Sequence, residues 1–545
     1  RRVDAIVQKS GGNLHDSMRI KGAVFCALDE GKSKRGHLYI SSEELEKSAL
    51  KLLNEKIPVP ELRLHQQEVR DMMQEMILNG AIVSVKDNIY LPRVFAQEDE
   101  TARRIAQRLV TQMPVEHIAP VLEQVKVEMG LRLSAQQEAA VYAAFRHGLS
   151  VITGSPGTGK TTVLRTILEV YRRLPPDGKI AFMAPTGRAS RRMSESTGFE
   201  DARTLHSGLG LTSEEDEGSR NRKSEPLSAD LIIVDEFSMV DMWLFFVLIS
   251  KVKNGARVVF IGDPDQIPSV GPGNVFKEMI DSGVIPVTVL DVQFRQAEGS
   301  RIIINALKMN NGDTDLLFGD DFQFISVDSD EVAAEVIADL YQKKLEANHG
   351  DTDMVQVLTP FRQDTAVGAN ALNKKLRELV NPQVQGCLEM KLGSSVFRLQ
   401  DKVMQLKNKE EVSNGDMGIV TDIYQNEDGT PTLVVRFEDG RIGEYASEDY
   451  GLLMLAYAAT IHKSQGSAYP SVIIPVLPCF KRMLKRNIYY TAVTRARCEV
   501  TLVGDWAAFC EAVMTDDREK RNTKLAYRIQ QEALRIEKIK SQETG

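Results

Sequence analysis

The sequence has few of the residues that mark disulfide-bonded, zinc-binding or membrane-spanning proteins. Only 5 of its 545 residues are cysteines, and they are scattered, with no CxxC pair and no histidine pair at metal-ligand spacing. A disulfide framework and a zinc site are therefore not expected, whereas a reducing cytoplasmic compartment is. No apolar run approaches the roughly 20 residues that a helix needs to cross a bilayer, so no membrane partner is expected.

An excess of positive charge is also lacking. The 68 Lys and Arg residues are outnumbered by 76 Asp and Glu residues, which gives a net charge of −8 at pH 7. Nucleic-acid-binding proteins usually have a basic surface, but a protein that follows a strand needs positive charge only along one groove. Basic clusters occur at 188–192 and 481–486, and each is explained equally well as a solvated helix face. Net charge therefore decides nothing about a nucleic-acid partner.

The chain is too long for a single hydrophobic core, and its patterning changes along its length. It begins at Arg1 without an initiator methionine, so we expect it to be a fragment. Residues 1–130 are predicted to be mainly helical with one hairpin, a winged-helix-like unit that suits either DNA binding or protein interaction. From Leu133 onward, short apolar runs alternate with helical segments, which is the pattern of parallel-sheet α/β domains.

Two series of buried strands are predicted after Leu133, and they indicate two α/β domains. The first series is expected at 149–153, 180–184, 231–234 and 257–261, and the second at 287–290, 355–359, 472–476 and 500–503. In residues 393–452 short strands are separated by Asn-Gly, Asp-Gly and Gly-Thr-Pro turns, which predicts a small β-barrel inserted into the second domain. The tail at 513–545 is charged and helix-favouring, with no apolar stripe wide enough to need a core.

A phosphate-binding loop lies between the first predicted strand and a helix. It fits the pattern GxxxxGK[ST], in which glycines let successive backbone N–H groups turn toward phosphate oxygens at a helix N-terminus. Lys160 is expected to reach the β and γ oxygens of ATP, and Thr161 to ligate Mg²⁺. The residues predicted to bind ATP here are Gly154, Ser155, Pro156, Gly157, Thr158, Gly159, Lys160, Thr161 and Thr162.

Two carboxylates follow another predicted strand. Asp235 and Glu236 come directly after the apolar run 231–234, which places them at the C-terminal edge of a buried parallel strand. Open α/β sheets bind their ligands at that edge. Asp235 is predicted to hold Mg²⁺ through water, and Glu236 to orient and deprotonate the attacking water. A carboxylate that activates water favours a nucleoside triphosphatase over a small-molecule kinase.

A glutamine follows the strand at 257–261, in the segment Gly-Asp-Pro-Asp-Gln at 262–266. From this adjacent strand end Gln266 is predicted to reach the γ-phosphate and to register its loss, which is the coupling that a motor needs. Taken alone, Gly-Asp-Pro is only a turn signal.

In their order along the chain, these motifs resemble those of the superfamily-one helicases, and specifically the RecD-like, 5′→3′ subgroup, over about 133–505. The motifs that carry the resemblance are LSAQQ at 133–137, the phosphate loop, APTGRA at 184–189, TLH at 204–206, DEFSM at 235–239, GDPDQIPSVG at 262–271, FRQ at 294–296, ATIHKSQGS at 459–467 and YTAVTRAR at 490–497. The resemblance implies an α/β fold with two RecA-like P-loop domains, one at 131–288 and one at 289–392 and 453–512. It also implies a pin-like insert at 207–229.

The resemblance further implies roles for single residues. Gln137 matches the glutamine that reads adenine, and Arg295 and Arg495 match arginines that touch the γ-phosphate, with Arg495 acting as a finger from the second domain. The residues implied to grip DNA are Thr186, Arg188 and His206 on the first domain and Thr359 and His462 on the second. An ordinary polar loop at 462–463 and a surface ion pair at Arg295 are the alternatives when these motifs are taken singly.

The predicted function is ATP-driven translocation on single-stranded DNA, with 5′→3′ unwinding at ss/ds junctions in repair or recombination. ATP and Mg²⁺ are the expected cofactors. Two features depart from the family: only the end of a helix-hairpin-helix region is present, at 3–12, and residues 212–219 are acidic where a strand-splitting pin would carry an apolar wedge. A DNA-dependent ATPase or remodelling subunit that does not separate strands, and a binding module with an inactive P-loop, are the alternative interpretations.

Overall fold

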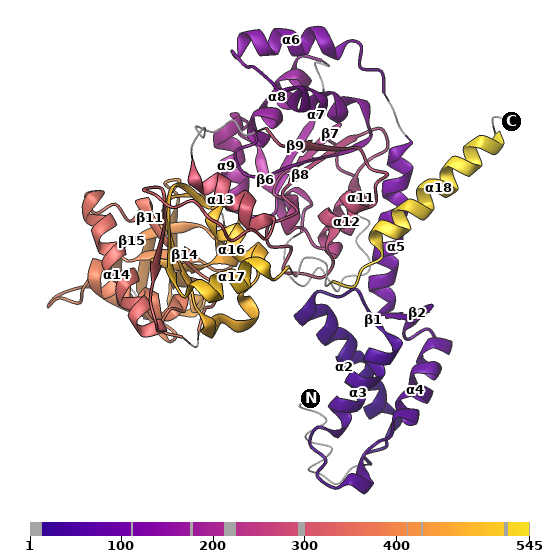
Figure 1. The fold of residues 1–545 in the computed structure, drawn as a ribbon, viewed down its shortest axis with the longest axis horizontal. Helices are drawn as coiled ribbons and strands as arrows, with labels where there is room; N and C mark the ends of the chain where they lie inside the picture. The colour runs from indigo at the N-terminus through magenta and orange to yellow at the C-terminus, as the bar shows by residue number, and fades with distance from the viewer. Residues whose placement is uncertain are drawn as a thin grey trace.

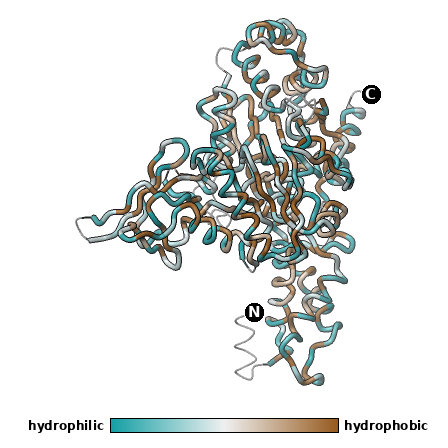
Figure 2. The backbone as a smooth tube through the Cα atoms, turned by 60° about the vertical axis from the view of Figure 1, so that its left-hand side comes forward, coloured by the Kyte–Doolittle hydropathy of each residue, from teal (hydrophilic) through white to brown (hydrophobic). Residues whose placement is uncertain are grey.

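The structure is a computed structural model that describes residues 13–110, 113–174, 178–211, 225–292, 300–363, 365–410, 412–426, 429–516 and 521–543. Figure 1 shows three parts: an N-terminal helical unit, a first α/β domain above it, and a second α/β domain to one side. Figure 2 shows hydrophobic stretches concentrated in the strands inside the molecule. Within the described ranges, no helix is both long enough and apolar enough to cross a membrane.

The N-terminal unit has a hydrophobic core of its own. Its elements are α2 (Ser17–Arg35), β1 (Tyr39–Ser41), α3 (Ser42–Asn54), α4 (Gln66–Leu78), β2 (Val83–Val85) and β3 (Asn88–Tyr90). The three helices bury Val24, Leu45 and Met73 between them. The β2–β3 hairpin turns at Lys86, whose φ of 57° is left-handed, and β1 pairs antiparallel with β3. A helical unit with one hairpin is thus present, but its core extends only from Ile20 to Ile89 and not over the predicted range 1–130. The helices within 92–128 contribute to the cores of the first α/β domain.

The first α/β domain is built on a six-stranded parallel sheet of order β6-β5-β7-β8-β4-β9. Its elements are α5 (Pro92–Leu109), α6 (Ile118–Glu128), α7 (Ala135–Arg146), β4 (Leu149–Gly154), α8 (Lys160–Arg172), β5 (Ile180–Ala184), α9 (Gly187–Thr197), β6 (Ala202–Thr204), α10 (Leu205–Gly208), β7 (Leu231–Val234), α11 (Met242–Lys251), β8 (Arg257–Gly262), α12 (Val275–Asp281) and β9 (Val287–Leu290). Every residue of β4 and β7 is buried, as expected for strands covered by helices on both faces.

The placement of residues 287–290 in the second strand series was wrong. As β9, this segment pairs in parallel with β4, with Val287 opposite Val151, and it closes the edge of the first sheet. The sequence of a four-residue apolar strand does not show to which sheet the strand belongs. The pairing of a strand is set by the connection that precedes it and not by its own composition.

The second α/β domain is built on a five-stranded parallel sheet of order β10-β21-β20-β11-β19. Its elements are α13 (Arg301–Asn310), β10 (Phe322–Ser326), α14 (Asp330–Ala347), β11 (Val355–Thr359), α15 (Ala369–Val380), β19 (Ala458–Thr460), β20 (Tyr469–Val476), α16 (Arg486–Val493), β21 (Ala496–Gly504) and α17 (Trp506–Met514). Two parallel sheets, each flanked by helices, confirm the predicted α/β fold class.

An antiparallel unit lies between α15 and β19. Its strands are β12 (Glu389–Leu392), β13 (Ser395–Arg398), β14 (Lys402–Gln405), β15 (Met417–Gln425), β16 (Pro431–Phe437), β17 (Ile442–Tyr445) and β18 (Leu453–Leu455). They form a five-stranded sheet of order β17-β16-β15-β14-β18 and a separate β12–β13 pair. Phe397, Leu433 and Tyr445 are among the residues that fill one small apolar core inside this unit.

The C-terminal helix α18 (Leu525–Glu543) corrects the expectation that the tail needs no core. Leu525 and Ile529 are fully or almost fully buried, and they belong to the hydrophobic core of the first α/β domain. The helix packs on α5 and α12 over its first turns, and its remainder extends away from the body of the protein (Figure 1). The apolar stripe is only two turns long, so the sequence pattern of this otherwise charged helix does not reveal it.

Candidate active site

The phosphate loop occupies the carboxyl end of β4, directly before α8. Gly157 and Gly159 have left-handed φ angles of 88° and 82°, which only glycine adopts at little cost. A Cβ on Gly154 would lie 2.6 Å from the Thr158 hydroxyl, so this position also needs glycine. The Lys160 ammonium lies over the loop and donates to the carbonyls of Gly154 and Ser155. The loop therefore has the backbone turn and the central cation that phosphate binding requires.

The carboxylates of Asp235 and Glu236 lie at the carboxyl end of β7. Burial raises the pKa of Asp235 to about 6, and the neighbouring charge of Glu236 adds to this, while the positive charges of Lys160 and Arg192 act in the opposite direction. Glu236 has a left-handed φ of 50°, and its N–H donates to the Asp235 carboxylate at 2.8 Å. Non-glycine residues with such backbone angles cluster at functional sites, where the surrounding structure maintains the strain.

The two α/β domains meet at Gln266 and Arg495. Gln266 lies in the loop after β8, and Arg495 follows α16. The Arg495 guanidinium donates to the Gln266 side-chain oxygen at 2.7 Å, and both residues are about 95% buried, with exposures of 4% and 5%. The neighbouring Ile267 N–H donates to the Thr491 hydroxyl at 2.9 Å. An arginine of the second domain is thereby held against the loop of the first domain that borders the phosphate site.

Two buried residues in this region escaped the sequence interpretation. Asp263 follows β8, and burial raises the pKa of its carboxyl group, while the charge of Lys160 acts against the increase. The phenol of Tyr490, on α16, donates to this carboxylate at 2.8 Å. The signal for Asp263 was the same as for Asp235, an acidic residue just beyond a buried strand, but Gly-Asp-Pro also fits a turn.

Arg192 is a third residue that the sequence interpretation missed, because it was grouped with a basic cluster. Its guanidinium donates to the Gly466 carbonyl at 2.8 Å, across the domain boundary. Burial lowers the pKa of Arg192 to about 10, against the effect of the Glu236 carboxylate. No pattern in the sequence separates this arginine from Arg188 and Arg191, which also lie on α9.

Gln137 lies beside the phosphate loop at the start of α7. Its side-chain oxygen accepts from Ser134 N–H at 3.0 Å, which completes a capping box, and its amide donates to the Thr158 carbonyl at 3.4 Å. The side chain is 2% exposed. Its contact with adenine stays a prediction.

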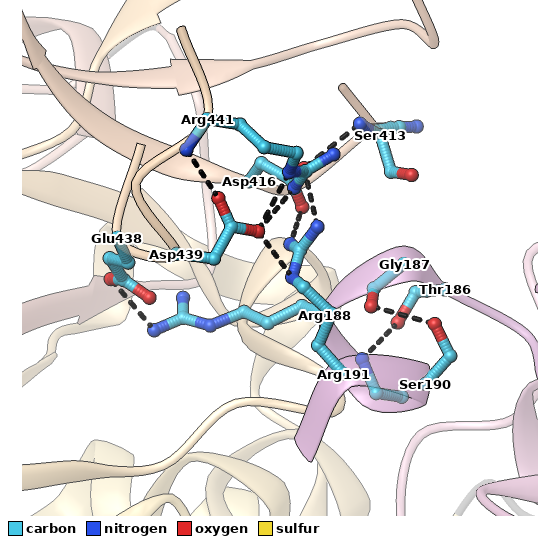
Figure 3. A network of polar contacts seen from close by, with 12 residues as sticks. Thr186, Gly187, Arg188, Ser190, Arg191, Ser413, Asp416, Glu438, Asp439 and Arg441 are labelled. Atoms are coloured by element: carbon cyan, nitrogen blue, oxygen red, sulfur yellow. Dashed lines mark hydrogen bonds and ion pairs between the residues drawn. The ribbon is translucent and has the colours of Figure 1, made fainter. Parts of the chain in front are cut away.

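Thr186 and Arg188, implied to bind DNA, lie where the first domain meets the second. The Thr186 hydroxyl accepts from Ala189 N–H at 3.2 Å and caps α9. Arg188 donates to the Tyr469 hydroxyl at 3.1 Å, and its guanidinium lies 5.1 Å from the centre of that ring. Figure 3 shows Arg188 also pointing to Glu438 of the antiparallel unit, at 3.3 Å.

The other residues implied to bind DNA are more dispersed. His206 is exposed, with its ring 6.4 Å from that of Trp243. Thr359 is fully buried and donates to the Val367 carbonyl at 2.8 Å. His462 is half-buried in the 3-10 turn Ile461–Ser464, and burial lowers its pKa. Their contacts with a strand stay predictions.

Some predicted features fall outside the described residues. Arg295 is in the segment 293–299, most of the pin-like insert is in 212–224, and the segment 3–12 is also outside. The roles assigned to them stay predictions.

A phosphate loop on one parallel sheet and a buried arginine from a second sheet define a two-domain P-loop nucleoside triphosphatase. The comparisons with known proteins extend this. Residues 137–272 match the AAA domain, residues 372–437 the ATP-dependent RecD-like DNA helicase SH3 domain, and residues 455–503 the UvrD-like helicase C-terminal domain. The chain belongs to the RecD-like DNA helicases of superfamily one, as its similarity to a curated relative over almost its whole length shows.

That relative is the ATP-dependent RecD2 DNA helicase of Deinococcus radiodurans, 31% identical over 535 residues, which are 97% of this chain and 71% of the relative. The RecBCD enzyme subunit RecD of Mycolicibacterium smegmatis is 29% identical over 68% of this chain and 70% of its own length. A crystal structure of Pif1 helicase from Bacteroides in complex with ADP-AlF3 and ssDNA is 22% identical with a TM-score of 0.46, covering 71% of this chain and 94% of that one. The match to the RecD2 DNA helicase and the matching domain families confirm the family resemblance and the class of ATP hydrolase.

Proposed function

We propose that this protein moves 5′→3′ along single-stranded DNA and unwinds duplex DNA at ss/ds junctions, in repair or recombination. The hydrogen bond from Arg495 to Gln266 carries the proposal, because it joins the domain that holds the phosphate loop to the domain that supplies the arginine. A γ-phosphate between these groups would draw the domains together, and its loss would remove that attraction. The 5′→3′ polarity rests on the resemblance to the RecD-like subgroup.

In this proposal each residue of the site has one task. Gln137 contacts the adenine, Lys160 binds the β and γ oxygens, Glu236 takes a proton from the attacking water, and Arg495 stabilises charge on the γ-phosphate together with Arg295. Thr161 and Asp235 are the residues that would hold Mg²⁺, which supplies charge neutralisation at the phosphates. Both offer hard oxygen ligands, and a divalent cation would favour the ionised form of the buried Asp235 carboxyl.

Unwinding of forked duplexes tests the proposal most directly. A fork with a 5′ single-stranded tail is expected to be separated in the presence of ATP, whereas a duplex with only a 3′ tail is not. ATP turnover should rise with either tail, because both present single-stranded DNA to the same two domains. Strand separation is measured by gel or fluorescence and turnover by phosphate release, with Lys160→Ala as the inactive control. Separation from the 3′ tail alone would contradict the proposed polarity.

A second function has one observation in its favour. Several curated relatives are named as the RecD subunit of the RecBCD enzyme, so this chain is also a candidate for a DNA-dependent ATPase that acts within a complex. In that case DNA would stimulate ATP turnover, but the isolated protein would separate neither the substrate with the 5′ tail nor the substrate with the 3′ tail. The fork experiment therefore distinguishes the two functions.

The proposed DNA track gives a prediction for Arg188. Replacement by alanine is expected to raise several-fold the DNA concentration that half-stimulates ATP turnover, with DNA-free turnover nearly unchanged. Contacts with the phosphate backbone carry little sequence information and weaken with salt. Titration of turnover with a poly-dT oligomer at two salt concentrations measures both effects.

The structure supplies matched variants for this titration. Glu438→Gln removes the carboxylate that pairs with Arg188, so it is expected to lower the half-stimulating DNA concentration. Arg172→Ala replaces a half-exposed arginine that pairs with Glu169 on α8, and it should leave the titration unchanged. If Arg188→Ala behaves like Arg172→Ala, Arg188 does not belong to the DNA track.

A further inference from the structure

Arg521 holds the loop that carries Gln266. It lies in the C-terminal segment, which we define as residues 521–528. We define residues 263–273, between β8 and α12, as the coupling loop. The Arg521 guanidinium donates from Nη1 to the carbonyls of Gly271 at 2.8 Å and Gly273 at 2.7 Å, and from Nη2 to the carbonyl of Ser269 at 2.7 Å. Nη1 also lies 3.3 Å from the Ser269 hydroxyl. One side chain thus gathers three backbone carbonyls of the loop.

This arrangement depends on the shape of the guanidinium. Its two terminal nitrogens form a rigid planar fork, so the carbonyls of Ser269 and Gly271 are held at a fixed separation on different nitrogens. Three carbonyl dipoles that point at one place repel one another unless a cation lies between them. A lysine ammonium supplies the charge at one point only and cannot reproduce the fork.

The position of Arg521 is itself fixed by the residues that follow it. Asn522 N–H donates to His37 Nδ1 at 3.0 Å, and the Asn522 carbonyl accepts from Leu38 N–H at 2.8 Å, both in the N-terminal unit. The fully buried Glu98 of α5 accepts from the Lys524 N–H at 2.7 Å and from the Arg528 guanidinium at 3.0 Å. The C-terminal segment is therefore anchored on the N-terminal unit and on α5.

The other end of the coupling loop faces the second α/β domain. Gln266 accepts from Arg495, the Ile267 N–H donates to Thr491, and the Ile267 carbonyl accepts from the Gln465 amide at 2.8 Å. Only Pro268 lies between Ile267 and Ser269, the first residue that Arg521 holds. A shift at the anchored end would therefore move Gln266 relative to Arg495.

We propose that Arg521 is a positioning residue for ATP turnover, which fixes the coupling loop so that Gln266 meets Arg495 across the domain boundary. The inference rests on the proposed role of Gln266 in turnover. It also makes the N-terminal unit part of the support of the active site, because Gly273 N–H donates to the Gly36 carbonyl at 2.9 Å beside Arg521. In this proposal Arg521 affects turnover through the backbone of the coupling loop.

DNA-free ATP turnover of the full chain provides the test, in a double-mutant cycle of Arg521→Ala and Gln266→Ala. Arg521→Ala is expected to lower turnover on the order of tenfold with little change in KM, because small misplacements of positioned groups cost up to about a hundredfold. Arg521→Lys should recover only part of the loss. The matched control is Arg535→Ala, which replaces an exposed arginine of the following helix α18 and should leave turnover unchanged.

The cycle separates positioning from general damage. If Arg521 acts through Gln266, the double variant is expected to be no slower than Gln266→Ala alone. Three results would overturn the inference. The first is a double variant whose loss of turnover is the product of the two single losses. The others are an Arg521→Ala variant as active as Arg535→Ala and a full recovery of turnover in Arg521→Lys. Because these measurements need neither DNA nor strand separation, failure of the fork experiment would remove the helicase proposal without altering this result.

Discussion

Exchange of Glu236 for glutamine is expected to stop ATP hydrolysis while ATP still binds. The amide keeps the size of the side chain but cannot take a proton from water, and a general base contributes about 10²–10⁴-fold to such reactions. Lys160→Ala should abolish turnover as well, because it removes the cation that lies over the phosphate loop. Phosphate release measures turnover, and a fluorescent nucleotide measures binding.

Two comparisons make this experiment specific. Lys179→Ala replaces an exposed lysine of the same domain and should have normal turnover. Asp235→Asn should lower turnover and also weaken Mg²⁺ binding, so that more Mg²⁺ is needed for turnover, because Asp235 is the proposed metal ligand. Glu236→Gln should lower turnover without this change. Near-normal DNA-stimulated turnover in Glu236→Gln would show that another group activates the water.

Removal of the Arg495 guanidinium is expected to lower turnover by about a thousandfold, which is the scale found for arginine fingers, with a much smaller loss of ATP affinity. Arg495 belongs to the second α/β domain, so the proposed nucleotide contacts of Gln137, Lys160 and Asp235 on the first domain would remain. Single-turnover phosphate release and equilibrium nucleotide binding separate the two effects.

Arg497 provides the matched control for Arg495. It lies two residues away, at the start of β21, and its side chain is exposed. Arg497→Ala is expected to retain turnover, whereas Arg495→Ala is not. A loss below about tenfold in Arg495→Ala would contradict a finger role, because stabilisation of transition-state charge is worth at least 10³-fold in that role.

The parts of the site that the sequence predicted are those in which chemistry follows directly on a buried strand. The phosphate loop follows β4, and Asp235 follows β7, so strand, turn and side chain are neighbours in the sequence. The family resemblance then supplied Arg495, which no local pattern distinguishes. For these features, residues that are close in the sequence are also close in the structure.

The remaining parts depend on contacts between distant segments. Tyr490 meets Asp263 from 227 residues away, and Arg521 meets Ser269 from 252 residues away. No periodicity indicates such pairs, because each partner alone looks like an ordinary polar residue. The assignment of residues 287–290 to the first sheet was missed for a related reason, since a strand does not carry the identity of its neighbours.

The burial of Leu525 and Ile529 has a consequence for biosynthesis. These side chains complete the core of the first α/β domain. In the sequence, the whole second domain lies between them and the helices α5 and α12 that they cover. On the ribosome, which releases the chain from its N-terminus, the surface of α5 and α12 must wait uncovered until residue 529 has emerged. The first α/β domain, which carries the phosphate loop, is therefore synthesised before the second but completes its core after it.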